Sequence, residues 1–467
     1  MGFLSILLTL WIAGGDPARP DKSNSTMAYI PQVAFILCAA AAVFLFAGKV
    51  REIRRNILLG RSYEPEGTVS DRVRNLLLLA FGQRKMFRNP FVAVMHLVIY
   101  AGFIIINLEV LEIVIDGLFG THRIMAGPLG KAYGWLINSF EWLALGVILT
   151  CVVFLARRNL VRLPRFRSRD LDGWPRSDAN YILLAEIVLM SLFLFMNAAD
   201  TTLQGRGHPS YSAHPTGDFA VSGFLKPLLS GLSDNGLVAL ERACWWLHIL
   251  GIFAFLNYLP WSKHLHILLA FPNSYYTRIG STGRMTNMPE IQREVLYAME
   301  PESAPASGTE AAPQRFGAKD VFDLDWKNLM DAYSCTECGR CSAACPANQT
   351  GKLLSPRKIM MDTRDRLEAV GRNINENGGT FKDDGRSLLS DHITEEELRA
   401  CTTCNACVEE CPVSISPLDI ILQMRRYLVM EKSQAPQEWT MMFGNVENNF
   451  APWKFAPDDR AKWMEEA

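Results

Sequence analysis

The chain has 467 residues, a formal net charge of −1 at pH 7 and 49% hydrophobic residues. A charge this close to zero gives no basic excess of the kind that favours nucleic-acid binding, which we exclude. The apolar residues concentrate in residues 27–271, whereas residues 272–467 have the composition of a soluble domain. Length and composition therefore predict a membrane part followed by a soluble part.

Five segments are apolar over about 20 residues, the length that an α-helix needs to cross a bilayer. They are residues 28–48, 91–115, 135–156, 180–197 and 237–257. We expect the fifth to continue past Pro260 to about residue 270. The apolar start of residues 1–26 is too short to span and lacks the positive charges of a signal peptide. The prediction is an all-α fold, with a bundle of five transmembrane helices.

The loops differ in positive charge. Residues 49–90 and 157–180 contain ten and seven Lys or Arg, whereas residues 116–134 and 198–236 contain two each. Positive residues accumulate in cytoplasmic loops, so this asymmetry predicts an N-terminus outside and a C-terminal domain in the cytoplasm.

Two cysteine runs carry the most specific signal. They are "CTECGRCSAACP" from Cys335 and "CTTCNACVEECP" from Cys401, each with the spacing C-x2-C-x2-C-x3-C-P. In proteins with two [4Fe–4S] clusters, the fourth cysteine of each run binds the other cluster. One predicted ligand set is Cys335, Cys338, Cys341 and Cys411, and the other is Cys401, Cys404, Cys407 and Cys345.

Other roles for the cysteines fit less well. Zinc also accepts four thiolates, but four cysteines followed by proline in both runs favour iron–sulfur clusters. Dense cysteines of this kind also suit a reducing compartment, in agreement with the loop charges. The remaining three, Cys38, Cys151 and Cys244, lie singly in apolar segments and are interpreted as packing residues.

The soluble part divides further. Residues 272–316 are expected to be a linker, whose Pro/Ala/Ser-rich end, residues 301–316, forms a flexible tether. Residues 317–432 show helical patterns at 356–372, 393–404 and 417–432 and almost no strand pattern, which predicts a helical ferredoxin domain with two clusters. The aromatic tail, residues 433–467, has little helical pattern; it either docks a partner or covers its own domain.

Histidines in the apolar segments are candidate haem ligands. If the fifth helix is continuous, the 18 positions between His248 and His266 make five turns and about 27 Å, so both lie on one face at opposite membrane depths. His96, near the cytoplasmic start of the second helix, lies at a depth similar to His266. Two imidazoles on facing helices can hold a six-coordinate haem b. The alternative is that these histidines bond to backbone or lipid headgroups.

Acidic residues collect towards the outer ends of the helices: Glu109, Glu112, Glu141 and Glu241, with Asp116 and Arg242 nearby. Charges inside a membrane are costly and by default indicate function. A quinol releases two protons with its two electrons, so these acids are candidates for a quinone site with proton release. The alternative is that they face headgroups or water.

The fifth segment, "WWLHILGIFAFLNYLPWSKHLH", resembles the last helix of the nitrate reductase gamma subunit family of cytochromes b. The resemblance implies that His96 and His266 hold the haem nearest the cytoplasm. The family's second haem pairs the position of His248 with a histidine on the second helix, where this chain has Ile106. His248 therefore takes a ligand from elsewhere, such as His208 or His214, binds a five-coordinate haem, or helps to bind quinone.

Residues 70–432 as a whole resemble the membrane-bound heterodisulfide-reductase-like iron–sulfur proteins of bacteria. The resemblance is carried by "FGQRKMFRNP" before the second segment, by "WWLH…P…HLH" and by both cysteine runs. It implies a haem b domain at residues 27–271 joined to a ferredoxin domain similar to the C subunit of heterodisulfide reductase. The expected location is the bacterial cytoplasmic membrane, where the lipid surrounds the helices and the clusters lie in the cytoplasm.

The function expected from this resemblance is electron relay between menaquinone, haem b, two [4Fe–4S] clusters and a cytoplasmic partner. The partner is a separate cysteine-rich heterodisulfide-reductase-like subunit, or a flavoprotein if the chain is a component of an electron-transfer-flavoprotein:quinone oxidoreductase. A hypothesis from another class is a redox sensor or assembly subunit. No G-x-G-x-x-G motif follows a strand and no nucleophile–base set is evident, so no substrate-transforming site of its own is predicted.

Overall fold

The computed structural model describes residues 29–161, 163–212, 216–281, 283–304, 315–454 and 456–465. Within these ranges the regular elements are all helices, and the extended pairings are two isolated bridges. The prediction of an all-α fold is confirmed. The predicted N-terminal segment, residues 1–26, lies outside the described part of the chain.

The chain divides into two compact units. The first consists of residues 1–55, 68–275 and 333–339, and the second of residues 56–67, 276–332 and 340–467. The first cysteine run is thus divided between them, because the segment with Cys335 and Cys338 groups with the long helices.

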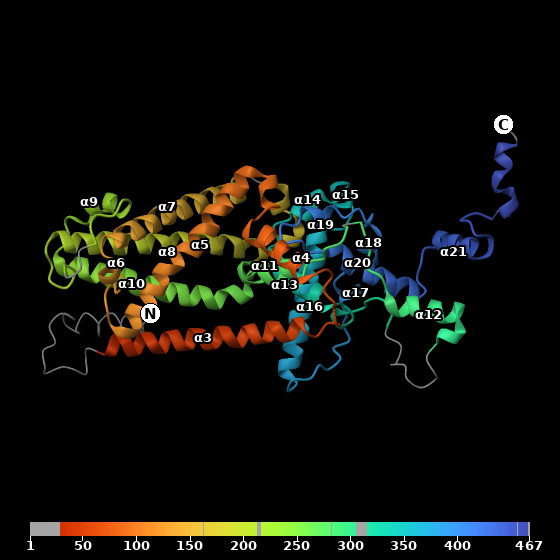
Figure 1. The fold of residues 1–467 in the computed structure, drawn as a ribbon, viewed down its shortest axis with the longest axis horizontal. Coiled ribbons are helices and arrows are strands. Elements are labelled where there is room, and N and C mark those ends of the chain that lie inside the picture. The colour runs from red at the N-terminus through yellow and green to blue at the C-terminus, as the bar shows by residue number, and fades with distance from the viewer. Residues whose placement is uncertain are drawn as a thin grey trace. The chain divides into compact units, whose positions relative to one another are not determined.

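Five helices are long and apolar enough to cross a membrane, which confirms the five predicted spans. They are α3 (Ile30–Ile57), α5 (Pro90–Phe119), α7 (Lys131–Asn159), α8 (Trp174–Gly205) and α10 (Asp234–Tyr258). Helix α8 packs against both α7 and α10, and Figure 1 shows these three side by side. Side chains such as Ile137, Phe193 and Ile249 are fully buried between the helices, while many Leu, Val and Phe side chains remain exposed, as lipid contact requires.

Local sequence determines where these helices begin and end. The Asn89 side chain accepts a hydrogen bond from the backbone N–H of Val92, and Pro90 occupies the first position of α5, where no N–H is needed. The helix ends at Gly120, whose φ of +69° favours glycine. Helix α5 therefore starts shortly before His96 and carries the acidic residues at its other end.

The prediction that the fifth helix continues to about residue 270 is wrong. Helix α10 ends at Tyr258, and two 3₁₀ turns, Leu259–Trp261 and Lys263–Leu265, separate it from α11 (His266–Tyr275). Pro260 lacks an N–H and disfavours a continuous helix, and Ser262 between the two turns is fully extended. His248 and His266 therefore lie on different helices, and the argument from five continuous turns fails.

The second unit is built on α16 (Pro356–Glu376), which packs against α20 (Pro417–Arg426). Its other helices include α12 (Pro289–Met299), α13 (Trp326–Ser334), α14 (Arg340–Ala344), α15 (Pro346–Gln349), α17 (Leu388–Asp391), α18 (Glu395–Arg399), α19 (Ala406–Glu410) and α21 (Gln437–Asn449). The segment after α3 joins this unit, because the backbone of Arg61 exchanges hydrogen bonds with Leu324 and Trp326. Gly60 allows this approach, since a Cβ there would lie 2.7 Å from the carbonyl oxygen of Leu324.

Two expectations for the connecting segments need correction. The predicted linker contains helix α12, and residues 305–314 of the predicted tether lie outside the described residues. The tail has more helix than its pattern indicated, because α21 and the 3₁₀ helix Pro457–Met464 lie within it.

A buried ion network stabilises the second unit. Arg366 on α16 donates hydrogen bonds to both carboxylate oxygens of Asp320, at 2.7–3.2 Å, and to both of Asp384. Asp320 also accepts from the backbone N–H of Leu388. Arg366 is fully buried, so both its charge and that of Asp320 depend on this pairing.

We expect Arg366→Met to destabilise the second unit by about 3–5 kcal/mol, because it leaves the Asp320 carboxylate without its main partner. Thermal unfolding of the purified protein measures the change. Arg372→Met, at an exposed position of the same helix, is the control. An equal loss of stability in both variants would show that the ion network is not the cause of the destabilisation.

Candidate functional site

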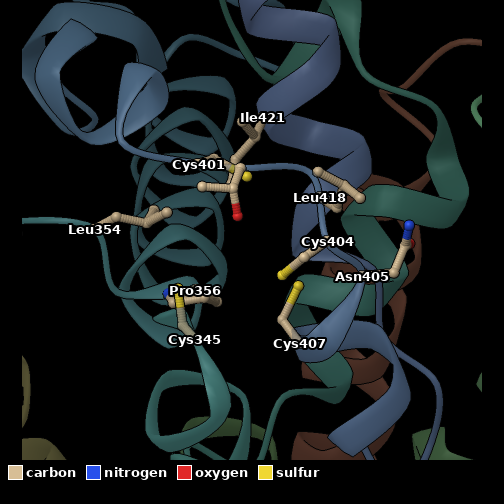
Figure 2. Close-up of a pocket in the computed structure, with 10 residues that line it drawn as sticks. Cys345, Leu354, Pro356, Cys401, Cys404, Asn405, Cys407, Leu418 and Ile421 are labelled. Atoms are coloured by element: carbon tan, nitrogen blue, oxygen red, sulfur yellow. The ribbon is translucent and has the colours of Figure 1, made fainter. Parts of the chain in front are cut away.

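Four cysteines from the two runs line one pocket of the second unit. Cys401, Cys404 and Cys407 come from the second run and Cys345 from the end of the first, and the pocket has an empty volume of about 310 Å³. Figure 2 shows the four side chains around one opening, with Leu354 and Pro356 on one side and Leu418 and Asn405 on the other. These are the four cysteines that the crossed-ligand rule groups together.

Positive φ angles and hydrogen bonds define the backbone conformation around this pocket. Thr403 and Asn405 have φ values of +56° and +61°, which turn the chain tightly between them. The backbone N–H of Thr403 donates to the Cys401 sulfur at 3.4 Å. Arg425 donates to the carbonyl oxygens of Leu398 and Cys401, so its positive charge lies beside the first cysteine of the run.

The cysteines of the pocket differ in exposure and acidity. Cys404 is exposed, whereas Cys407 is buried. Burial raises the pKa of the Cys407 thiol to about 12 and also raises the pKa of Cys401. Without a bound cation these two thiols would stay protonated at neutral pH, and positively charged iron would supply the stabilisation that a thiolate needs.

The four cysteines of the pocket surround a common volume, as a multi-iron cluster requires. Within the described residues, no group of three or more His, Cys, Asp or Glu side chains lies close enough together to hold a single ion.

The other predicted ligand set is divided between the units. Cys341 lies in α14 and Cys411 directly follows α19, and these two helices pack against each other, with an ion pair between Arg340 and Glu410 at 3.6 Å. Cys335 is buried and Cys338 partly buried in the segment that groups with the membrane helices. Their common ligation remains a prediction.

Three histidines in the membrane unit share one bonding pattern through Nδ1. His96 donates to the amide oxygen of Gln83 at 3.0 Å, His266 to the carbonyl oxygen of Lys263 at 3.0 Å, and His248 to that of Leu189 at 2.9 Å. Because Nδ1 carries the hydrogen in each ring, Nε2 keeps its lone pair. Metal-binding histidines are oriented in the same way by an outer hydrogen bond.

His248 has a ring nitrogen that fits a bound group. Its side chain is fully buried, and its Nε2 atom has no hydrogen-bond partner. An unsatisfied buried nitrogen is costly unless it binds something. Ile106, where the resembled family has a histidine, is a buried core residue, and His208 lies edge-on to Tyr211. His214 lies outside the described residues.

The imidazole of His264 interacts electrostatically with those of His96 and His266, although α10 and α11 are not continuous. The rings of His264 and His266 are 5.5 Å apart. Burial lowers the pKa of His264 to about 3 and also lowers that of His266, so both imidazoles are neutral, as metal ligation requires. The sequence interpretation missed Gln83, which a φ of +48° turns towards His96.

The predicted acids belong to a buried network at the opposite end of α5. Its centre is Arg123, which donates to Asp200, to Asn197 at 2.7 Å and to the Tyr133 hydroxyl at 3.0 Å. Tyr133 in turn donates to Glu112 at 2.8 Å. The sequence interpretation missed Arg123 and Asp200. It placed Asp200 in a loop, whereas α8 continues to Gly205 and buries Asp200 completely.

The other three acids extend this network. Glu141 accepts from Asn197 at 3.0 Å and from the backbone N–H groups of residues 221 and 222. Glu241 accepts from the Tyr211 hydroxyl at 2.8 Å and pairs with Arg242, which also bonds to His122. One carboxylate oxygen of Glu109 is buried without a hydrogen-bond partner. All four acids are buried within the described part of the chain.

Comparison with protein families assigns the soluble part. Residues 334–415 match the family model described as a 4Fe-4S dicluster domain. This range contains all eight cysteines of the two runs. The chain therefore has an iron–sulfur domain. No solved structure matches the chain.

Two relatives are similar over nearly the whole chain. A protein of Bacillus subtilis named "Probable iron-sulfur-binding oxidoreductase FadF" is 26% identical over 93% of this chain and 60% of its own length. The "EtfAB:quinone oxidoreductase" of Syntrophomonas wolfei is 27% identical over 92% of this chain and 59% of its own length. The chain thus spans about three fifths of the length of these curated relatives.

A third relative is similar to the soluble part. The C subunit of the ferredoxin/F(420)H(2)-dependent CoB-CoM heterodisulfide reductase of Methanosarcina acetivorans is 35% identical over 23% of this chain and 53% of its own length. Together with the five candidate spans, these similarities describe a membrane protein with an electron-transfer role. The chain is similar to an iron–sulfur-binding oxidoreductase, to an EtfAB:quinone oxidoreductase and to a heterodisulfide reductase subunit, and it carries a 4Fe-4S dicluster domain.

Proposed function

We propose that the chain is a membrane electron-transfer subunit that relays electrons between menaquinone, haem b, two [4Fe–4S] clusters and a cytoplasmic redox partner. The observation that carries this proposal is the shared Nδ1 bonding of His96, His248 and His266, which keeps the Nε2 lone pair of each ring available in a chain with a dicluster domain. A chain with only a ferredoxin role would not need oriented histidines in the unit that contains its long apolar helices.

The two clusters take the crossed ligand sets. Cys401, Cys404, Cys407 and Cys345 hold the second cluster, and Cys335, Cys338, Cys341 and Cys411 hold the first. Each fourth cysteine lies beside the proline that turns the chain away, and the α14–α19 pair brings the ends of the two runs together. Because Cys404 is exposed, the second cluster is the one that exchanges electrons with the partner.

His96 and His266 hold one haem b. The haem supplies one-electron chemistry when bound, and the chain's part is to keep both imidazoles neutral and oriented. Gln83 and the carbonyl of Lys263 do this by accepting the Nδ1 hydrogens. His248 is available to a second haem or to quinone, since its Nε2 is buried and unsatisfied.

Quinol oxidation at the acidic end of α5 would require groups that accept two protons. The buried network there contains more carboxylates than arginines, as such a role needs. Glu109, with a carboxylate oxygen that has no partner, is the acid best placed to face a ligand. Glu112, Glu141 and Glu241 then pass protons through the bonded network.

The loop charges favour an orientation with the acidic end outside and the cluster domain in the cytoplasm of a bacterial cell. The favoured partner is a cysteine-rich heterodisulfide-reductase-like subunit, because the soluble part resembles the C subunit of a heterodisulfide reductase. A second candidate is electron entry from an electron-transfer flavoprotein, which the name of the Syntrophomonas relative favours. The direction of electron flow depends on the reduction potentials of the haem and the clusters, which the protein groups around them set.

Our first test is His266→Ala in the purified full-length protein. We expect loss of a haem in an optical redox titration, and a quinol analogue that no longer reduces the clusters, while about eight cluster irons remain. His392→Ala, in the second unit, is the control. Cluster reduction that survives in His266→Ala would exclude the haem relay and favour a redox sensor.

A second prediction concerns the residue that orients His96. Gln83→Leu removes the acceptor of the Nδ1 hydrogen, and we expect it to weaken haem binding about 10–100-fold, as loss of an outer ligand partner does. Haem content after washing with a haem-binding protein measures this. Gln83→Glu keeps an acceptor and should retain haem; equal haem in all three proteins would speak against ligation by His96.

The third prediction tests crossed ligation. Cys345→Ser should reduce the cluster iron from about eight to about four per chain, because one cubic cluster loses a ligand. Its electron paramagnetic resonance signal should match that of Cys404→Ser and differ from that of Cys338→Ser. Cys151→Ser, at a buried position outside both runs, should keep all the iron. A match with Cys338→Ser would assign Cys345 to its own run.

A further inference from the structure

Lys263 contacts two parts of the proposed electron path, one through its backbone carbonyl and the other through its ammonium group. It lies in the 3₁₀ turn before α11, and its carbonyl oxygen accepts the Nδ1 hydrogen of His266 at 3.0 Å. Its ammonium group donates to a carboxylate oxygen of Glu337 at 2.6 Å. The side chains are 10% and 3% exposed, so the ion pair is shielded from water.

Glu337 belongs to the first cysteine run. It stands between Cys335 and Cys338, is 5% exposed and has a φ of +53°, a conformation that few side chains adopt without constraint. The segment 333–339 and Lys263 are parts of the same compact unit, so this contact lies within one unit.

Lys263 is itself held in place by α8. Its backbone N–H donates to Asp178 at 3.0 Å, and its ammonium group also donates to the carbonyl oxygen of Pro175, both on α8. An ammonium bonded to two acceptors on different segments has little freedom to rotate. The position of Glu337 is thereby tied to the backbone that orients His266.

We propose that Lys263 is a positioning residue for electron transfer between the haem at His266 and the first cluster. The inference rests on the proposed function, since it needs both groups. When both groups are bound, the haem held by His266 and the cluster would exchange one electron in either direction, with no proton transferred and no bond formed or broken. Lys263 holds the loop with Cys335 and Cys338 at a fixed position relative to His266.

The experiment compares the full-length holoprotein with Lys263→Met, which removes the charge but keeps the carbonyl that His266 needs. We expect normal haem and iron content and normal haem reduction by a quinol analogue in stopped-flow measurements. The later reduction of the clusters should slow by about 10–100-fold, the effect of losing an outer-shell partner. Lys226→Met, which removes an exposed ion pair with Asp218 in the same unit, should leave both phases unchanged.

Rescue separates positioning from general folding. Lys263→Arg should restore most of the cluster rate, because it restores the ion pair with Glu337. If Lys263→Met does not assemble, Glu337→Gln removes the same ion pair without touching Lys263 and should slow the same phase.

The outcomes distinguish this inference from the proposed function. An unchanged cluster rate in Lys263→Met or Glu337→Gln, with normal cofactor content, overturns the role of Lys263 and leaves the relay intact. Absence of haem from the unaltered protein, or cluster reduction that survives in His266→Ala, overturns the relay itself.

Discussion

The geometry of the His96 end of the bundle depends on the three hydrogen bonds that Asp178 accepts. They come from the Tyr258 and Ser262 hydroxyls and from the backbone N–H of Lys263, which together span the break between α10 and α11. Asp178 is 2% exposed, so these donors replace the water that its charge would otherwise need. The break starts α11 at His266 and directs the carbonyl of Lys263 to its ring.

The two ends of α5 differ in the charge of the buried polar groups around them. Near one end the imidazoles of His96 and His266 are oriented by neutral acceptors. Near the other end six carboxylates are buried, and two of them pair with an arginine: Asp200 with Arg123 and Glu241 with Arg242. The six are Glu109, Glu112, Asp116, Glu141, Asp200 and Glu241. In the proposed relay, the first end would serve electron transfer and the second would serve proton transfer.

Much of the molecule could be predicted from the sequence, because hydrophobic length and cysteine spacing are local signals. The five spans are of this kind. The break after Pro260 could be predicted only in part, because the proline disfavours a continuous helix but the turns that follow also depend on Asp178, about 80 residues earlier in the chain. Gln83 and Arg123 were missed for the same reason: each acts through a tertiary contact, with His96 and with Asp200 respectively. Helix α21 lacks the periodic apolar sequence pattern of a buried helix, because none of its residues is buried.

The distance between the two ends of α5 bears on the role of His248. His96 and Glu112 are 16 residues apart on α5, which corresponds to about 24 Å along a helix. One haem at His96 and His266 would leave an electron from quinol at the acidic end without a carrier over most of this distance. A redox group at His248, which is fully buried on α10, would divide it. If quinol is oxidised at the acidic end, as proposed, electron transfer to the His96 end would therefore need a redox group at His248, and the buried Nε2 without a partner fits that arrangement.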